Sequence, residues 1–142
     1  DAGFLATILL WGWHEMSFLM GFVTGPRREA CPPDASGWRR FRLATATLIH
    51  HEIALAVTAL ILVLVTLGQP NPIAAWTFLL LFGMRLSTKF NIFLGVPQFS
   101  DEMLPDHLSY LRSYFRRSRG NPLLPLSGLG SLGLTAVLGW LA

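Results

Sequence analysis

Apolar residues in this chain are gathered into four long runs, which are separated by more polar segments over residues 24–40, 68–71 and 97–122. Each run holds at least about 20 residues, which is the length an α-helix needs to cross the hydrocarbon core of a bilayer. A further stretch, residues 101–117, places leucines and a phenylalanine at spacings of three and four, which is typical of an amphipathic helix lying in the headgroup layer. The pattern predicts an all-α polytopic membrane protein with four transmembrane helices and one interfacial helix. The expected spans are residues 2–23, 41–67, 72–96 and 123–142 of a single domain.

Composition agrees with a membrane location. Of the 142 residues, 52% are hydrophobic and only 13% are charged, and the mean hydropathy is +0.49. A single cysteine, Cys31, excludes an internal disulfide. The chain begins at Asp1, directly before an apolar run and without a basic leader, so we expect no signal peptide and a C-terminal piece of a longer protein.

Nine of the eleven basic residues lie in two of the three connections between the expected spans or, for Arg42, at the start of the second span, and the other two, Arg85 and Lys89, lie inside the third span. The connection after the second span carries none, so the positive-inside rule places the two basic connections in the cytoplasm. The nine arginines concerned are Arg27, Arg28, Arg39, Arg40, Arg42, Arg112, Arg116, Arg117 and Arg119. This charge bias accounts for the orientation of the spans in the membrane and for contact with anionic lipid, and it does not indicate that the protein binds nucleic acid.

Ionisable and polar residues recur inside three of the apolar runs, where charges are costly and therefore seldom incidental. Counting about 1.5 Å of rise per residue from the cytoplasmic ends of the expected spans places these groups about 10–16 Å deep in all three. We call this set the polar layer. It comprises His14, Glu15, His50, His51, Glu52, Arg85, Lys89 and Asn91.

The polar layer allows three interpretations. In the first, Glu15 and Glu52 form ion pairs with Arg85 and Lys89 that hold the spans in register. In the second, a neutral histidine ligates a bacteriochlorophyll, with His50 and His14 as candidates. The third is a quinone or metal site, for which His14, His50 and His51 are suitable ligands. A metal is disfavoured because adjacent helical residues do not share a face, so we expect no metal ligand here.

The last apolar run differs from the others in its small residues. Ser127, Ser131, Thr135 and Gly139 recur every four residues and therefore share one helix face. Small residues at this spacing let another helix approach closely, so this face is predicted to be a helix-contact face.

Three stretches together resemble one protein family. They are WHEMSFLMGFVTGPRR, LIHHEIALA and MRLSTKFNIFLGVPQFSDEMLPDHLSYLRSYFRR. They are similar to the PuhE-like photosynthetic complex assembly family of purple and related phototrophic bacteria. Ala46 four residues before His50 also resembles the Ala-x-x-x-His pattern of bacterial antenna helices.

The resemblance implies a multi-span protein of the bacterial inner (intracytoplasmic photosynthetic) membrane. Its expected role is that of a non-catalytic accessory subunit or assembly factor of a reaction centre–light-harvesting complex. Its expected partners are reaction-centre subunits, antenna polypeptides and membrane lipid. Bacteriochlorophyll or carotenoid at an interface is the cofactor that this role would allow. The alternative is a membrane-embedded pigment-, quinone- or metal-binding protein or enzyme that uses His14, His50 and His51.

Overall fold

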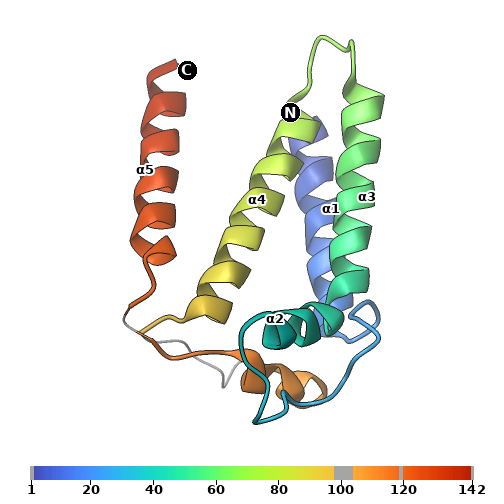
Figure 1. Ribbon diagram of the computed structural model, residues 1–142. Coiled ribbons are helices and arrows are strands. Elements are labelled where there is room, and N and C mark those ends of the chain that lie inside the picture. Colours follow the sequence, from blue (N-terminus) through green and yellow to red (C-terminus); the bar gives the residue numbers. More distant parts are fainter. Residues whose placement is uncertain (1, 98–103, 119, 142) are drawn as a thin grey trace. The chain divides into compact units, whose positions relative to one another are not determined.

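The computed structural model describes residues 2–97, 104–118 and 120–141, and this part of the chain is built from helices without a strand. The only sheet-like pairing there is an isolated bridge between Val96 and Arg117. The all-α class is thus confirmed (Figure 1). The elements are α1 (Ala2–Leu19), α2 (Gly37–Ala46), α3 (Ile49–Thr66), α4 (Ile73–Leu94), the 3-10 helix η1 (Asp106–Tyr114) and α5 (Leu123–Leu141).

The chain divides into two compact units. The first unit holds the described part of residues 1–84 and 101–114, and the second holds the described part of 85–100 and 115–142. Helix α4 contributes its first half to the first unit and its second half to the second.

The core of the first unit is formed by α1, α3 and the first half of α4. Leu55, Ala59 and Phe78 are buried at its centre. The ring of Trp11 meets that of Phe78 edge-on, with the centroids 5.3 Å apart. At one end Thr7 donates a hydrogen bond of 2.9 Å to the carbonyl of Gly3 within its own helix, so its hydroxyl is satisfied although it is buried.

Two helices replace the single one expected over residues 41–67. Helix α2 ends at Ala46, and α3 begins at Ile49 after a non-helical Leu48 with φ −139° and ψ 3°. Thr47 closes the last turn of α2, because its hydroxyl and its N–H both donate to the carbonyl of Ala44. The expected span is therefore wrong at its start, since this local hydrogen bonding competes with continuation of the helix.

Helices α3 and α4 are long and apolar enough to cross a membrane. Only 17% of the apolar window of α3 and 11% of that of α4 are buried within the protein, whereas the core helix of a soluble protein would be mostly buried. The apolar stretch Leu123–Val137 of α5 is shorter, and α1 is not among the helices that qualify. Length and composition therefore indicate a membrane location on the strength of two helices rather than four.

The element expected over 101–117 also differs from the prediction. Residues 101–103 lie outside the described part, and the helix that follows is a 3-10 helix, Asp106–Tyr114. Leu108, Leu111 and Tyr114 are buried and lie three residues apart, which is the period of a 3-10 helix. Its apolar face is therefore turned toward the protein. Phe115 to Arg117 leave the helix because Val96 bonds to the backbone of this segment, donating to the carbonyl of Arg116 at 3.1 Å.

Candidate functional site

Two buried histidines of the polar layer lie together in the first unit. His14 on α1 is 5% exposed and His51 on α3 is fully buried, and their ring centroids are 6.3 Å apart. Nε2 of His14 is hydrogen-bonded to Oγ1 of Thr58 at 2.9 Å. Phe18 tilts against the ring of His51 at a centroid distance of 4.9 Å. We call His14 and His51 the histidine pair.

The break between α2 and α3 positions His51. Because α3 starts at Ile49, the N–H of His51 has no partner within the helix, and it donates to the carbonyl of Thr24 at 3.1 Å. The next residue, Gly25, lies so close to the break that a Cβ there would be 2.2 Å from the carbonyl oxygen of Ala46. The segment after α1 is thus fitted into the α2–α3 junction, and only glycine can occupy this position.

The new helix bounds also change the depth of the pair. His51 lies two residues inside α3, about 3 Å from the helix start, and His14 lies five residues before the end of α1, about 7.5 Å from it. The depth of about 10–16 Å predicted for the polar layer from longer spans is therefore too large for the pair when it is measured from the helix ends. The pair lies near the end of the helices, beside the connection between α1 and α3.

The other members of the polar layer are distributed over both units. His50 is exposed on α3, and Glu15 and Glu52 beside the pair are half-buried. Arg85 and Lys89 are half-buried on the half of α4 that belongs to the second unit. Ion pairs between these carboxylates and cations stay a prediction.

Asn91 belongs to a separate polar cluster in the second unit. Its Nδ2 donates to the carbonyl of Ser87 at 3.0 Å and to Oγ of Ser127 at 2.9 Å. Asn121 in turn donates to Oδ1 of Asn91 at 2.9 Å, and its own Oδ1 accepts the N–H of Leu123 at 3.0 Å. We call Asn91, Asn121 and Ser127 the amide cluster. It fastens the start of α5 to α4.

Asn121 was not singled out in the sequence, although a signal was present. Asn directly before Pro122 and an apolar run is typical of a helix start, because the amide oxygen caps a backbone N–H and proline is tolerated in the first turn. Of the predicted helix-contact face, Ser127 meets Asn91 of the same chain. The hydroxyls of Ser131 and Thr135 donate to carbonyls of their own helix, and Gly139 is exposed.

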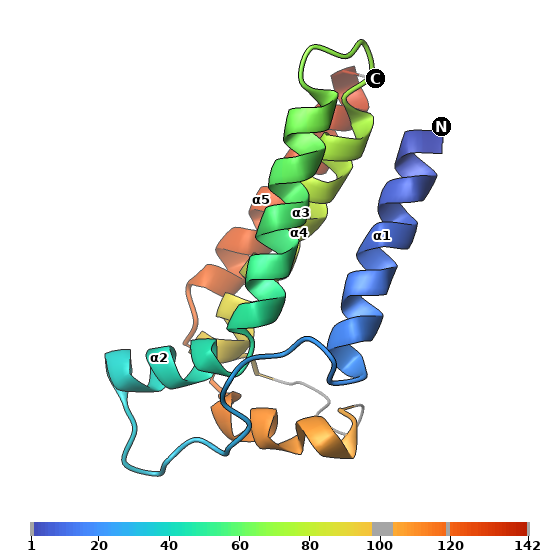
Figure 2. The ribbon, with the colours of Figure 1, turned by 90° about the vertical axis from the view of Figure 1, so that its right-hand side faces the viewer.

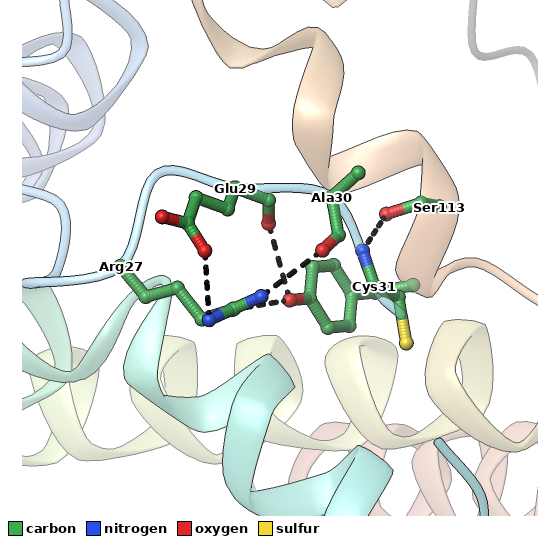
Figure 3. A network of polar contacts seen from close by, with 6 residues as sticks. Arg27, Glu29, Ala30, Cys31 and Ser113 are labelled. Atoms are coloured by element: carbon green, nitrogen blue, oxygen red, sulfur yellow. Dashed lines mark hydrogen bonds and ion pairs between the residues drawn. The ribbon is translucent and has the colours of Figure 1, made fainter. Parts of the chain in front are cut away.

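A third polar network lies outside the apolar helices and ties the α1–α2 connection to η1 (Figure 3). Arg27 donates through Nε to the hydroxyl of Tyr114 at 2.9 Å, and Tyr114 donates to the carbonyl of Glu29 at 3.2 Å. The hydrogen bond that Arg27 donates to Tyr114 is the main cause of the raised pKa of Arg27. Ser113 accepts the N–H of Cys31 at 2.7 Å. These contacts join residues more than 80 positions apart in the chain.

Two further hydrogen bonds join the segment around α2 and the end of α1 to η1. Arg40 on α2 donates to the carbonyl of Tyr114, and a ring nitrogen of His107 on η1 is bonded to the carbonyl of Leu19 at 2.8 Å. The basic segments around Arg27 and Arg112 therefore form one layer at one end of the first unit, beyond the end of α1 and the start of α3. We call this the basic cap, comprising residues 20–46 and 104–114.

Among the described residues, no group of three or more His, Cys, Asp and Glu side chains could hold a metal ion. Of the candidate pigment ligands, His14 has its Nε2 engaged by Thr58, whereas the ring of His50 is exposed on the surface of α3. The histidine pair is a polar contact within a helix bundle, and the amide cluster is a helix-fastening network.

Comparison with known proteins identifies the family. Residues 2–141 match the family described as "Protein of unknown function (DUF3623)". A relative from Rhodobacter capsulatus, described as "Uncharacterized 30.4 kDa protein in puhA 5'region", is 48% identical over 126 residues, which are 87% of this chain and 45% of that protein. The chain thus spans less than half the length of this relative. No solved structure matches. The chain belongs to the DUF3623 family.

Proposed function

We propose that this DUF3623 protein is a non-catalytic accessory subunit or assembly factor of a bacterial photosynthetic reaction centre–light-harvesting complex, of the PuhE-like kind. Support comes from the position of its Rhodobacter capsulatus relative in the 5′ region of puhA, a photosynthesis gene region. In this proposal the protein resides in the inner photosynthetic membrane. Reaction-centre subunits, antenna polypeptides and lipid are its neighbours.

The observation that carries the proposal is the apolar exterior of the helices. On α3 alone, five large aliphatic side chains are more than 50% exposed: Ile53, Leu60, Ile61, Leu64 and Val65. A soluble protein rarely leaves a continuous apolar face of this length in contact with water. Acyl chains and neighbouring apolar helices are the surroundings that would cover it, and a membrane complex supplies both.

The proposed topology has four spans with the basic cap in the cytoplasm. It is supported by the way in which the structure gathers Arg27, Arg40 and Arg112 at one end of the first unit, through contacts that both basic connections share. Lysine and arginine gathered on one side of the bilayer are the signature of the cytoplasmic face.

The direct test is to tag the chromosomal gene and purify the core complex from phototrophically grown cells. A subunit is expected to be retained in the mature complex at a fixed ratio to the reaction centre. An assembly factor is expected only in newly synthesised intermediates, with less mature complex after gene deletion. The proposal is wrong if neither complex contains the chain and deletion leaves the near-infrared absorption of the membranes unchanged.

A second candidate is pigment binding through His50, favoured by the exposure of this ring on an apolar helix. An exposed imidazole nitrogen can ligate a pigment held outside this chain, whereas His14 is already hydrogen-bonded to Thr58. Loss of a pigment band in His50→Phe, with normal yield of the protein, would favour this candidate. Glu52→Gln offers the complementary test, because an architectural polar layer predicts a lower folded yield and a binding site predicts lost pigment at normal yield.

A further inference from the structure

We propose that α2 is an amphipathic membrane-surface helix that binds anionic phospholipid headgroups through Arg39 and Arg42 and inserts Trp38 into the interface. The inference rests on the membrane location of the proposed function and is independent of the photosynthetic role. The observations come from the first unit, to which α1, α2, α3 and η1 all belong.

The position of α2 follows from the break at Thr47 and Leu48. Because the chain turns there, α2 runs across the direction of α3 instead of extending it (Figure 2). The turn is held from outside by Arg27, whose N–H donates to the carbonyl of Ala46 at 3.2 Å, and by the close approach of Gly25. A helix joined crosswise to the end of a membrane-spanning helix is placed at the level of the lipid headgroups.

The orientation of α2 about its own axis follows from its bond to η1. Arg40 donates to the carbonyl of Tyr114, so the side of α2 that carries Arg40 faces η1. Trp38 and Arg42 each lie two residues from Arg40, about 200° around the helix, and four residues from each other. They therefore share the face opposite η1. Figure 2 shows η1 on the side of α2 away from α3. The face of α2 that carries Trp38 and Arg42 is therefore turned to the side on which α3 lies.

The chemistry of that face suits a lipid surface. Trp38 is 71% exposed and stacks on Phe41 at a centroid distance of 5.1 Å, so α2 presents an aromatic pair. Tryptophan is enriched at the membrane–water interface because its ring is apolar and its N–H is polar. Helix α2 has no buried residue and no carboxylate among its ten residues.

Arg39 and Arg42 supply the charge. Both are exposed, and neither is held by a buried partner. Arg39 does contact Asp34, but both side chains are more than half exposed, so this pair is weak and open to exchange with a phosphate. A guanidinium matches phosphate with two parallel N–H donors, which favours a phospholipid headgroup as the ligand.

The experiment uses the full-length protein reconstituted into vesicles of phosphatidylcholine, alone or with phosphatidylglycerol added. A nitroxide on the lipid headgroup should quench tryptophan emission more strongly in the natural protein than in Trp38→Phe. The Trp38-dependent quenching should increase with phosphatidylglycerol. In Arg39→Gln/Arg42→Gln, the phosphatidylglycerol content that gives half of this increase should rise by about fivefold for each arginine removed.

The matched control is Arg28→Gln/Arg112→Gln, which removes the same charge from exposed positions of the basic cap outside α2. It should leave the half-point unchanged. An equal effect in both double variants, or no Trp38-dependent quenching in a protein that resists alkaline carbonate extraction, would overturn the inference. A protein that carbonate extracts would instead contradict the membrane location on which the proposed function depends.

Discussion

The histidine pair and the amide cluster are both buried and polar, yet they are built in different ways. Asn91, Asn121 and Ser127 lie within 36 positions of one another, and the two amides bond each other, the hydroxyl of Ser127 and the adjoining backbone. The histidine pair instead depends on residues from α1, α3 and the connection that follows α1. The comparison teaches that polar groups are buried here in two ways: amides bond one another and cap α5 in the second unit, whereas imidazoles pack against rings and a hydroxyl in the first.

This difference bears on function. Amides that bond one another and a helix start stabilise the joint between α4 and α5 and leave no group to react. The histidine pair of the first unit instead consists of imidazoles that lie against Phe18, Phe78 and Thr58, and imidazole is a side chain that can ligate a metal or pigment.

The largest effect is expected at the joint that supports the histidine pair. Gly25→Ala would place Cβ 2.2 Å from the carbonyl oxygen of Ala46 and 2.7 Å from the nitrogen of Leu48, both of them backbone atoms. Because backbone cannot move aside cheaply, we expect a loss of about 3 kcal/mol in the free energy of unfolding, seen as a low folded yield and a lower Tm in detergent.

Gly12→Ala is the matched control, since nothing lies within 4 Å of the added Cβ. It should be neutral or stabilise α1 by up to about 1 kcal/mol through helix propensity. Equal behaviour of the two variants would mean that the α1–α2 connection is not packed into the α2–α3 break.

The second effect concerns the amide cluster. Asn121→Ala removes the cap of α5 and leaves Oδ1 of Asn91 without its bond from Asn121, so we expect a loss of about 2 kcal/mol in the second unit. Faster hydrogen exchange in the first turn of α5 would report the loss of the cap. Asn71→Ala is the control, because Asn71 makes the same bond to the N–H of Ile73 at the exposed start of α4. A cost for Asn71→Ala as large as that for Asn121→Ala would show that burial of the amide cluster adds nothing.

The third prediction concerns the hydrogen bond to the histidine pair and uses a substitution that keeps the side-chain volume of Thr58. Thr58→Val keeps the shape of the side chain and removes the hydrogen bond to Nε2 of His14, which should cost about 1 kcal/mol. The value follows from a thermal melt, and Thr58→Ser should retain most of the stability because it keeps the hydroxyl. If Thr58→Val is as stable as the natural protein, the bond does not hold His14 in place.

The smallest effect lies on the surface, where neither cluster is involved. The hydrogen bond from Arg39 is the main cause that holds the pKa of Asp34 below its usual value. The carboxylate therefore stabilises the folded state above its unfolded pKa, and this contribution is lost as the pH falls through the lowered pKa. Asp34→Asn should lower Tm slightly at neutral pH, where the contribution is present, and leave the acid range unchanged, so that the small acid-dependent step disappears from a plot of Tm against pH. An unaltered plot would show that this exposed pair contributes nothing measurable.

Several features of the fold and site could be predicted from the chain alone. The helical class follows from long apolar runs, and the apolar surfaces of α3 and α4 follow from their length and composition. The predicted polar layer includes both members of the histidine pair, since charged and polar residues in an apolar run stand out. The division of the polar layer into separate clusters could not be predicted. Asn91 is hydrogen-bonded to Asn121, and a hydropathy pattern does not single out Asn121.

The sequence by itself determined the apolar helices, the basic connections between them and the ionisable groups within them. Each of these features is a property of residues that are neighbours in the chain. What only the tertiary structure decided is where helices stop and what their polar groups meet. The break at Thr47 is reinforced by Gly25 and Arg27, about 20 residues earlier, and η1 takes a three-residue period because Leu108, Leu111 and Tyr114 are buried together. Hydropathy is a sum over adjacent positions, whereas a hydrogen bond or a close approach depends on distant segments that only folding brings together.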